Sequence, residues 1–331
     1  MRAQVLIDWL TFTVSTKKYE NASYVDVAEY TPQEVISNFL KMDPALFVDT
    51  GFGLNGYQRV LSFGGIMVCY DPREDEHFHD MGVCVSMSGK GCRTFEALSA
   101  HGELPFFVLA NMLCDVPGSN VSRLDIACDD HDSFLDIDLI ADKAEANDVN
   151  SRLQKRDIHR SFDGSSDTGT TVYFGAKSSS FRIRIYDKAA EQGVQGHWVR
   201  CEMVFRGKNS LSFFQHLADG RSVGELSAQV LNDKIKFIDR DDSNISRCSV
   251  CKWWSDFVDT ILCLHLVSRP ELSHSVDRIR SWLVDQVAPS MAVIVQTFGV
   301  ERLVEIALSA KPRMSRQQRA LVSEFRRMPA V

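Results

Sequence analysis

Two kinds of hydrophobic pattern divide the chain. Up to about residue 208, short stretches rich in β-branched and aromatic residues alternate apolar and polar positions, which is the period of a half-buried strand. We expect strands at residues 5–14, 58–70, 82–88, 121–129, 170–175, 180–187 and 198–206. Helical spacing is rarer in this part. It predicts helices at 106–113, at 134–147, and from the capping box Thr31-Pro32-Gln33-Glu34 to Phe39.

After Asn209 the helical spacing continues almost to the end. Apolar residues recur every three to four positions at residues 211–218, 223–236, 253–264, 275–287, 290–298, 300–309 and 316–327. The change of pattern predicts an α+β fold in two domains. Residues 1–208 are expected to form a domain around a largely antiparallel sheet, and residues 209–331 an all-helical C-terminal domain.

The polar faces of three predicted strands carry a distinctive set of side chains, because alternate residues of a strand share a face. These faces hold Arg123, Asp125 and Asp129 on the first strand, Arg182, Arg184, Tyr186 and Lys188 on the second, and Arg200, Glu202 and Arg206 on the third. If the three strands are neighbours, one sheet face collects three carboxylates, several arginines, a lysine and a tyrosine.

This combination fits chemistry on a phosphate group. The carboxylates of Asp125, Asp129 and Glu202 are hard oxygen ligands that suit Mg²⁺ or Mn²⁺, and such a cation polarises phosphate oxygens. The phenol of Tyr186 is a candidate nucleophile, and the arginines with Lys188 are candidates for holding phosphates. The pattern taken alone also fits an ordinary solvated sheet face with arginine–carboxylate pairs across the strands.

Composition narrows the class of protein. The chain has 331 residues, of which 44% are apolar and 24% charged, as in an ordinary soluble globular protein. Its net charge of −7 argues against a protein that simply coats nucleic acid. No uncharged apolar run approaches the roughly 20 residues of a membrane helix, and Asp8 interrupts any secretory signal at the start. The nine cysteines, irregularly spaced, indicate reduced thiols in a cytoplasm.

Several motifs occur in a specific order along most of the chain. They are I-D-W-L-x-F-T (Ile7–Thr13), S-G-K-G-C-R (Ser88–Arg93), S-R-L-D-I-A-x-D (Ser122–Asp129), T-V-Y-F-G-A-x-x-S (Thr171–Ser179), R-I-Y-D-K (Arg184–Lys188) and R-C-E-x-x-x-R-G (Arg200–Gly207). In this order they resemble the Rep_trans replication-initiation-factor family, which starts rolling-circle replication of plasmids and filamentous phages. The Trp253-Trp254-x-x-Phe257 cluster and the segment from Trp282 to Ser290 resemble its phage-type members.

The resemblance implies a nicking enzyme with a tyrosine nucleophile, matched here by Tyr186, and a divalent metal, Mg²⁺ or Mn²⁺, held by acids. Tyr186 would become joined to the 5′ phosphate of the cut strand and leave a 3′ hydroxyl for synthesis. Lys188 and Arg184 are expected to assist, and the phosphate-binding set is expected to comprise Arg123, Arg182, Arg200, Arg206, Lys90 and Arg93. Partners would be origin DNA, as a single-stranded nick site and as duplex, a host helicase and a second copy in a homodimer, in the cytoplasm of a bacterial host.

Three alternatives remain at this point. A relaxase for conjugative or mobile-element transfer would use the same chemistry. A DNA-binding regulator on the same fold would not nick, although an intact Tyr186 and intact acids argue against it. A metal-dependent nuclease that activates water would stay active without Tyr186. For a nicking enzyme, residues 1–208 are expected to contain the chemistry, and residues 209–331 are expected to bind DNA or join protomers.

Four further signals have competing interpretations. His77-Phe78-His79 matches a metal signature of another nicking class, but it follows a run of acids typical of a loop. Cys248, Cys251, Cys263 and His265 are zinc-type ligands at unsuitable spacing, so core thiols are favoured. Ser88-Gly89-Lys90-Gly91 lacks the first glycine and the Ser/Thr of a phosphate-binding loop, and we interpret it as a turn with Lys90 and Arg93 facing phosphate. Trp253, Trp254 and Phe257 are expected in the core, and the basic 316–327 helix suits either phosphates or solvent.

Overall fold

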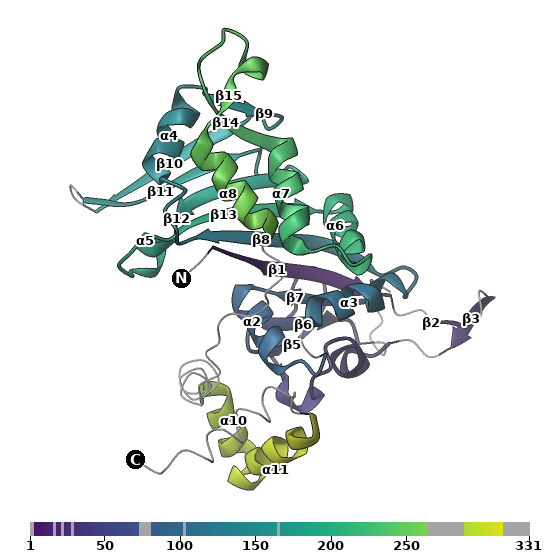
Figure 1. The fold of residues 1–331 in the computed structure, drawn as a ribbon. Helices are drawn as coiled ribbons and strands as arrows, with labels where there is room; N and C mark the ends of the chain where they lie inside the picture. The colour runs from purple at the N-terminus through teal and green to yellow at the C-terminus, as the bar shows by residue number, and fades with distance from the viewer. Residues whose placement is uncertain are drawn as a thin grey trace. The chain divides into compact units, whose positions relative to one another are not determined.

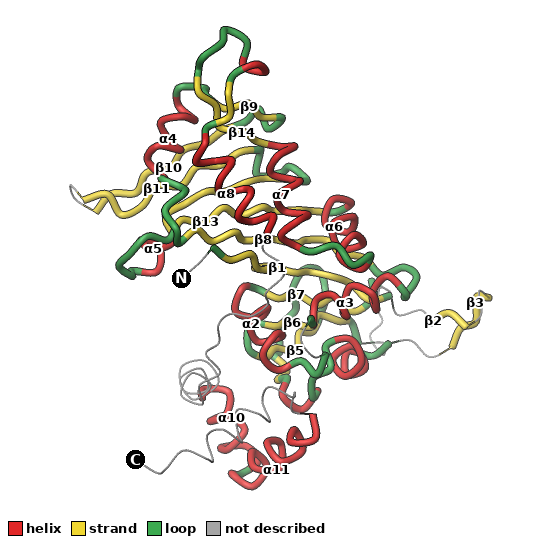
Figure 2. Tube along the Cα trace, viewed as in Figure 1, coloured by secondary structure: helices red, strands yellow, loops and turns green. Residues whose placement is uncertain are grey.

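The computed structural model describes residues 3–15, 18–20, 23–27, 30–72, 81–101, 104–163, 166–263 and 288–313. The chain forms two compact units. Unit 1 comprises Met1–Val14 and Ala110–Val267, and unit 2 comprises Ser15–Leu109 and Ser268–Val331. Figures 1 and 2 show the arrangement of elements within each unit.

Unit 1 is built on an antiparallel run of strands in the order β10-β11-β12-β13-β8-β1. The bounds are β1 Gln4–Val14, β8 Asn120–Asp130, β10 Arg156–Asp163, β11 Ser166–Phe174, β12 Phe181–Asp187 and β13 Val199–Arg206. A smaller antiparallel sheet has the order β15-β14-β9, with β9 Val149–Ser151, β14 Ile235–Asp239 and β15 Ser249–Val250. The strands predicted at 121–129, 180–187 and 198–206 are therefore confirmed, as is their adjacency.

Helices form a second layer on one face of the larger sheet of unit 1 (Figure 1). They are α4 Ile137–Glu145, α6 Lys208–Ala218, α7 Val223–Lys234 and α8 Lys252–Cys263. The short helix α5 Lys188–Gln192 is not part of this layer and directly follows β12 (Figure 1). The covered face is apolar: Ile126, Ile183 and Met203 are fully buried. Phe213 of α6 packs on Phe205, with ring centroids 5.0 Å apart. The opposite face of β8, β12 and β13 carries the polar side chains.

Unit 2 contains a smaller antiparallel run, β7-β6-β5-β4, and a separate hairpin of β2 and β3. Its strands are β2 Lys18–Glu20, β3 Ser23–Val27, β4 Val48–Asp49, β5 Arg59–Phe63, β6 Ile66–Tyr70 and β7 Val83–Met87. Its helical segments are α1 Pro32–Glu34, η1 Val35–Phe39, η2 Pro44–Leu46, α2 Gly89–Leu98, α10 Ala288–Phe298, α11 Val300–Ala310 and η5 Lys311–Arg313. Along the sequence, α3 Pro105–Cys114 spans the boundary of the units, and η3 Ile245–Arg247 belongs to unit 1. The capping box at Thr31 is confirmed.

Three expectations need correction. The region after 209 is not all-helical, because Ile235–Asp239 pairs with Val149–Ser151 as a strand. Residues 88–91 are not a turn: Ser88 caps α2, and a Cβ on Gly91 would meet the carbonyl oxygen of Gly65 at 2.3 Å, so this glycine permits close backbone packing. Lys188 does not continue its strand, because the carboxylate of Asp187 caps α5 instead.

The boundary expected at 208 stays a prediction about where the chemistry lies. By packing, α6, α7 and α8 belong to the same unit as the central sheet. The helices expected at 275–287 and 316–327 lie outside the described residues. Among the helices that are described, none is both long and apolar enough to cross a membrane.

Candidate active site

The polar side chains predicted to share a face meet on the neighbouring strands β12, β13 and β8. Tyr186 lies opposite Arg200, which lies opposite Asp129. Arg184 lies opposite Glu202 in the same register. Residues opposite each other in an antiparallel pair have Cβ atoms about 5 Å apart, so long side chains on this face contact their neighbours. The sheet therefore brings together the nucleophile candidate, the three carboxylates and their arginines.

Each of the three carboxylates is buried and bound to an arginine. Asp125, Asp129 and Glu202 are only 3%, 2% and 6% exposed. Arg200 donates two hydrogen bonds to Asp129, at 2.6 and 2.8 Å. The other two pairs are Arg123 with Asp125, at 2.6 and 3.0 Å, and Arg184 with Glu202, at 2.7 Å. Burial of this many charges is costly, so the set is not an ordinary solvated sheet face, and such clusters are typical of functional sites.

A fourth carboxylate, Asp8, joins this cluster through an irregularity in β1. The pairing of β1 with β8 shifts register between Ile7 and Trp9, which lets Asp8 and Trp9 both avoid the buried side. The Asp8 carboxylate forms an ion pair with Arg200 at 3.1 Å. The Arg123 guanidinium lies 4.2 Å from the ring centroid of Trp9. Sequence reasoning missed both residues because strict alternation puts Asp8 and Trp9 on opposite faces; the I-D-W motif was the available signal.

Tyr186 is enclosed by charged groups. Its side chain is buried, at 4% exposed, and its hydroxyl donates to Glu202 Oε2 at 3.5 Å. The Arg184 guanidinium lies 4.2 Å from the ring centroid, and the Lys188 Nζ lies 5.6 Å from it. Burial, and then the charge of Glu202, raise the pKa of Tyr186 above its usual value. The phenol therefore keeps its proton at neutral pH and needs a base in order to attack.

Asp125 has an altered acidity of its own. Burial raises the pKa of Asp125 to about 6, although the hydrogen bonds from Arg123 oppose that rise and the charge of Glu202 adds to it. The influence of Glu202 on Asp125 indicates that these two carboxylates lie within electrostatic reach of one another. They sit on adjacent strands, two residues out of register.

The carboxylates suit a divalent cation in chemistry but only partly in arrangement. Among the described residues, no group of three or more metal-ligating side chains is gathered closely enough to hold an ion. Both oxygens of Asp129 accept from Arg200. Both oxygens of Asp125 likewise accept from Arg123, so each aspartate would have to give up hydrogen bonds to an arginine in order to bind an ion. Asp125 and Glu202 are hard, buried carboxylates within electrostatic reach of one another, and are the pair that suits a cation best. The role of Asp125, Asp129 and Glu202 as metal ligands stays a prediction.

The predicted phosphate-binding residues differ in how free they are. Arg123, Arg184 and Arg200 are paired with acids, as described above. Arg206 donates to the carbonyl oxygens of Ser179 and Lys177, at 3.3 and 3.5 Å. Arg182 lies over the ring of Tyr173, 3.9 Å from its centroid. Lys90 and Arg93 lie on α2 in the other compact unit, with Lys90 exposed and Arg93 paired with Glu96 at 3.1 Å. As DNA contacts, Arg123, Arg182, Arg200, Arg206, Lys90 and Arg93 remain predictions, and so does the assisting role of Arg184.

The competing signals have different outcomes. Trp254 and Phe257 are buried, and Trp253 and Trp254 both pack against Phe237, so the core interpretation is confirmed. None of the nine cysteines forms a disulfide. Cys251 donates to Asp239 at 3.3 Å, and no zinc-type group of three ligands is found among the residues described. His77, His79, His265 and the 316–327 helix lie outside the described residues.

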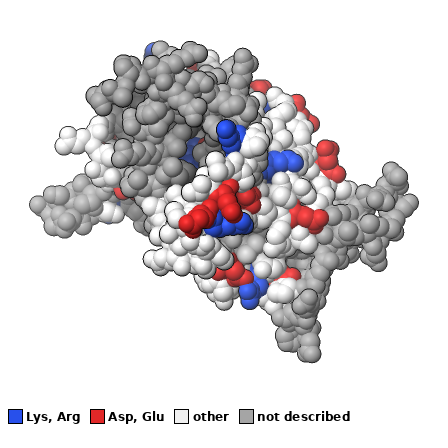
Figure 3. Space-filling model, turned by 90° about the horizontal axis from the view of Figure 1, so that it is seen from below, with Lys and Arg blue, Asp and Glu red and all other residues white. Residues whose placement is uncertain are grey.

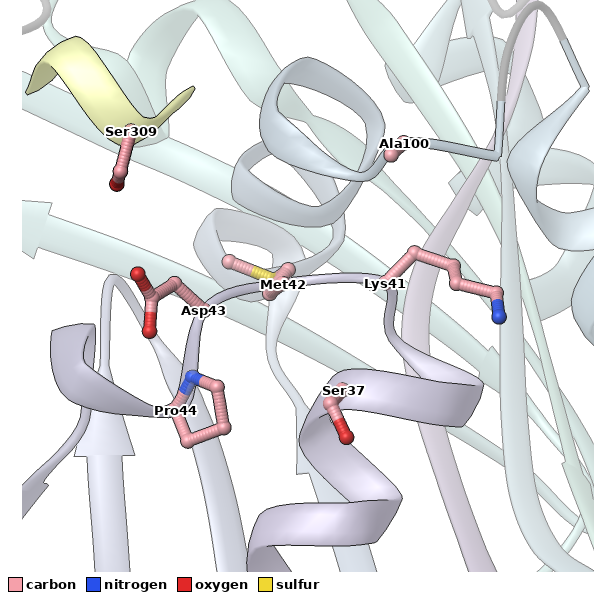
Figure 4. Close-up of a pocket in the computed structure, with 7 residues that line it drawn as sticks. All are labelled: Ser37, Lys41, Met42, Asp43, Pro44, Ala100 and Ser309. Atoms are coloured by element: carbon pink, nitrogen blue, oxygen red, sulfur yellow. The ribbon is translucent and has the colours of Figure 1, made fainter. Parts of the chain in front are cut away.

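Unit 2 offers a weaker candidate. A hollow of about 420 Å³ is lined by Ser37, Lys41, Met42, Asp43, Pro44, Ala100 and Ser309. The charged ends of Lys41 and Asp43 point away from one another there (Figure 4). The hydroxyls of Ser37 and Ser309 donate to the carbonyl oxygens of Glu34 and Ile306 rather than to Asp43. The face drawn in Figure 3 likewise shows acidic and basic side chains intermixed rather than a broad basic area.

Comparisons with known proteins decide the family. The profile described as "Replication initiation factor" matches residues 119–306, which is more than half of the chain. The chain belongs to the replication initiation factor family. A second profile, "Rolling Circle replication initiation protein N-terminal domain", matches residues 4–111. The family expected from the motifs is therefore confirmed.

Two proteins similar to this replication initiation factor match most of its length. The candidate DNA relaxase NicK of Bacillus subtilis (strain 168) is 27% identical over 274 residues, which is 79% of this chain and 76% of the relative. A solved rolling-circle replication initiator protein from Geobacillus stearothermophilus is 28% identical, with a TM-score of 0.71 over 81% of this chain and 99% of that one.

Proposed function

We propose that this replication initiation factor nicks and rejoins one DNA strand at an origin of rolling-circle replication, through a covalent link between Tyr186 and the 5′ phosphate. One observation carries the proposal: the Tyr186 hydroxyl donates to Glu202 inside a buried cluster of arginines and carboxylates. The family and both relatives support the choice of DNA as substrate.

In the proposed reaction, the Tyr186 oxygen attacks the scissile phosphorus and passes its proton to Glu202. The new P–O bond to tyrosine replaces the P–O3′ bond, and the leaving 3′ oxygen takes up a proton. The raised pKa of Tyr186 makes a base necessary, and Glu202 is the carboxylate hydrogen-bonded to the phenol. The phosphotyrosine keeps the energy of the broken bond, so a free 3′ hydroxyl can later reverse the step.

Arg184 and Lys188 are proposed to assist at the phosphate. The Arg184 guanidinium lies against the Tyr186 ring and binds Glu202, so it holds both partners of the proton transfer. Lys188 forms an ion pair with Glu191 on the first turn of α5. Its amino group lies near the Tyr186 ring, where it suits charge that develops on the leaving oxygen.

A divalent cation, Mg²⁺ or Mn²⁺, is part of the proposal. When bound, it would polarise the phosphate oxygens. Asp125 and Glu202 would hold it, Asp125 after giving up hydrogen bonds from Arg123. Asp129 would join them only by giving up hydrogen bonds from Arg200. Because a ligand carboxylate must be ionised, the raised pKa of Asp125 predicts that cation binding weakens as the pH falls below about 6.

The remaining partners are inferred from the family. Origin DNA, both as a single strand at the nick and as duplex, is the proposed substrate. A host helicase, a homodimeric state and the cytoplasm of a bacterial host complete the proposal. The similarity to a relaxase supports strand transfer between cells as the second candidate role, with the same chemistry at Tyr186.

Trapping the covalent intermediate tests the proposal. Single-stranded oligonucleotides tiled across the replicon that encodes the chain, labelled at the end 3′ of each candidate cut, are incubated with the protein and Mn²⁺. A labelled protein band, mapped by peptide mass to Tyr186 and missing in Tyr186→Phe, is expected. Cleavage by Tyr186→Phe at the wild-type rate would support a nuclease that activates water. Binding without cleavage by the wild-type protein would support a regulator.

A further inference from the structure

Beyond the nucleophile, the same sheet face continues outward over β12, β11 and β10 as a group of flat side chains. Tyr173 on β11 lies opposite Arg184 and diagonal to Arg182 and Tyr186. Its ring packs on two neighbours at once. The Arg182 guanidinium lies 3.9 Å from the ring centroid, and the His159 ring stands edge-to-face at 5.4 Å. Two tyrosine–arginine stacks, Tyr186 with Arg184 and Tyr173 with Arg182, therefore lie side by side.

The two stacks differ in charge. Arg184 is neutralised by Glu202, whereas Arg182 has no carboxylate within ion-pair distance among the residues that the structure describes. The Nε of Arg182 is buried and has no hydrogen-bond partner there either. Asp157, the acid opposite Tyr173 on β10, pairs with Lys155 at 3.6 Å. Arg182 thus keeps its positive charge available for a ligand that approaches this face.

This outer part of the face is also accessible. His159 is exposed, and Tyr173 and Arg182 are half-buried, in contrast to the buried groups around Tyr186. Phe174, the next residue along β11, points to the covered side, where its ring contacts Phe237 at 5.9 Å. Arg182 and Tyr186 are four residues apart on one strand, a distance of about 13 Å at 3.3 Å per residue. A nucleic-acid strand that crosses Tyr186 would therefore reach Tyr173 within a few nucleotides.

We propose that Tyr173, Arg182 and His159 form a subsite for an unpaired nucleotide of single-stranded DNA, next to the scissile phosphate. Its base stacks on the tyrosine–arginine pair, and its phosphate takes the charge of Arg182. Aromatic rings and guanidinium planes are the surfaces on which unpaired bases stack, without strong sequence preference. This inference rests on the proposed function for its substrate, yet it concerns binding and does not depend on the chemistry of Tyr186.

The test compares two fluorescent 20-mers, oligothymidylate and an abasic strand with the same phosphates, by anisotropy with the full-length chain. Stacking on one ring contributes about 1–3 kcal/mol, so Tyr173→Leu should lower affinity for oligothymidylate roughly 5- to 150-fold. Affinity for the abasic strand should fall far less. Tyr173→Phe, which keeps the ring, should bind oligothymidylate with an affinity close to that of the wild type. Arg182→Gln should weaken both strands and reduce the salt slope by about 0.7, the value for one phosphate of a single strand.

Arg160→Gln is the matched control for Arg182→Gln. Arg160 lies next to His159 on β10, but its guanidinium bonds to Glu145 of α4 on the helix-covered side. The inference is overturned if Tyr173→Leu binds oligothymidylate like the wild type. It is also overturned if both strands lose affinity equally, which would indicate a structural role. Nicking is measured separately. Absence of a Tyr186 adduct with intact stacking would refute the proposed function alone, and a Tyr186 adduct with no stacking effect would refute this inference alone.

Discussion

The hydroxyl of Tyr186 lies 3.5 Å from a carboxylate oxygen of Glu202, and both groups are almost wholly buried. The two residues come from adjacent strands, offset by two positions of the register. The same carboxylate oxygen accepts from Arg184 at 2.7 Å, which keeps it in place. The phenol hydrogen therefore faces a fixed acceptor in a site from which water is largely excluded.

Glu202→Gln should strongly reduce nicking while leaving the fold intact. The amide keeps the size of the side chain but cannot take the phenol proton, and loss of a general base lowers rates by about 10²- to 10⁴-fold. Single-turnover cleavage of a labelled strand measures the change. Raising the pH should partly rescue the variant, because more phenolate then forms. A rate within threefold of the wild type would show that Glu202 is not the base.

Removal of divalent metal should stop nicking, and Asp125 should account for much of the metal affinity. EDTA is expected to abolish cleavage and Mn²⁺ to restore it. Asp125→Asn should weaken Mn²⁺ binding at least tenfold, since hard cations prefer charged oxygen ligands. Electron paramagnetic resonance of free Mn²⁺ measures binding without reference to activity. Unchanged Mn²⁺ affinity in this variant would place the cation elsewhere.

The pair of Arg200 and Asp129 should contribute chiefly to stability. Arg200→Met leaves the buried carboxylate of Asp129 without its partner, and breaking a buried pair costs about 3–5 kcal/mol. Denaturant unfolding should show a much smaller loss for Arg221→Gln, in which the broken pair is partly exposed. If Asp129 is a metal ligand instead, Asp129→Asn should lower Mn²⁺ affinity more than it lowers the free energy of unfolding.

Unit 2 contains a buried acid that should make stability depend on pH. Burial raises the pKa of Glu96 from its usual 4.5 to about 7, against the opposing charge of Arg93. The folded protein then binds a proton more tightly than the unfolded chain, so the free energy of unfolding falls as pH rises from about 4.5 to 7. The difference corresponds to about 3 kcal/mol, fully lost above pH 7.

Glu96→Gln should remove that fall, because an amide does not ionise. Urea unfolding at pH 5, 6, 7 and 8 measures it: the variant should gain stability over the wild type only toward the alkaline end. Equal pH profiles for the two proteins would contradict the assignment of the raised pKa to Glu96. The aspartates of the active site are unchanged in both proteins, so their titration cancels in the comparison.

The sequence predicted which side chains share a sheet face better than it predicted the contacts between them. Alternation along residues 123–129, 181–187 and 199–206 correctly gave a shared polar face, because strand period follows directly from backbone geometry. It did not show which charges pair with one another, since pairing depends on register. Tyr173 was overlooked for the same reason: its packing partners come from β10 and β12, and no local pattern links them.

Local irregularities of the backbone, and the position of a strand directly after a helix, explain the other differences between the predicted and the observed structure. The register shift beside Asp8 and the capping of α5 by Asp187 both end a regular period at one residue, where alternation no longer holds. The strand Ile235–Asp239 follows a helix directly and has the composition of either element, so only its pairing with β9 decides it. The amphipathic helices α6, α7, α8, α10 and α11 were predicted correctly, but the sequence did not show that α6, α7 and α8 pack against the central sheet (Figure 1).

That packing changes what a truncation should do. A chain cut after residue 208 keeps every proposed catalytic residue but loses α6, whose Phe213 and Phe214 are almost completely buried against the sheet. It also loses Phe237, which packs on Phe174. We expect residues 1–208 to aggregate, because their apolar sheet face would be left uncovered. A chain cut after residue 263 keeps that second layer and should stay monodisperse, with cooperative unfolding and single-strand nicking. Size-exclusion chromatography and thermal unfolding of the two shortened chains measure the difference. A monomeric, cooperatively unfolding 1–208 chain would show that the helical layer is dispensable, as a catalytic domain that ends at residue 208 requires.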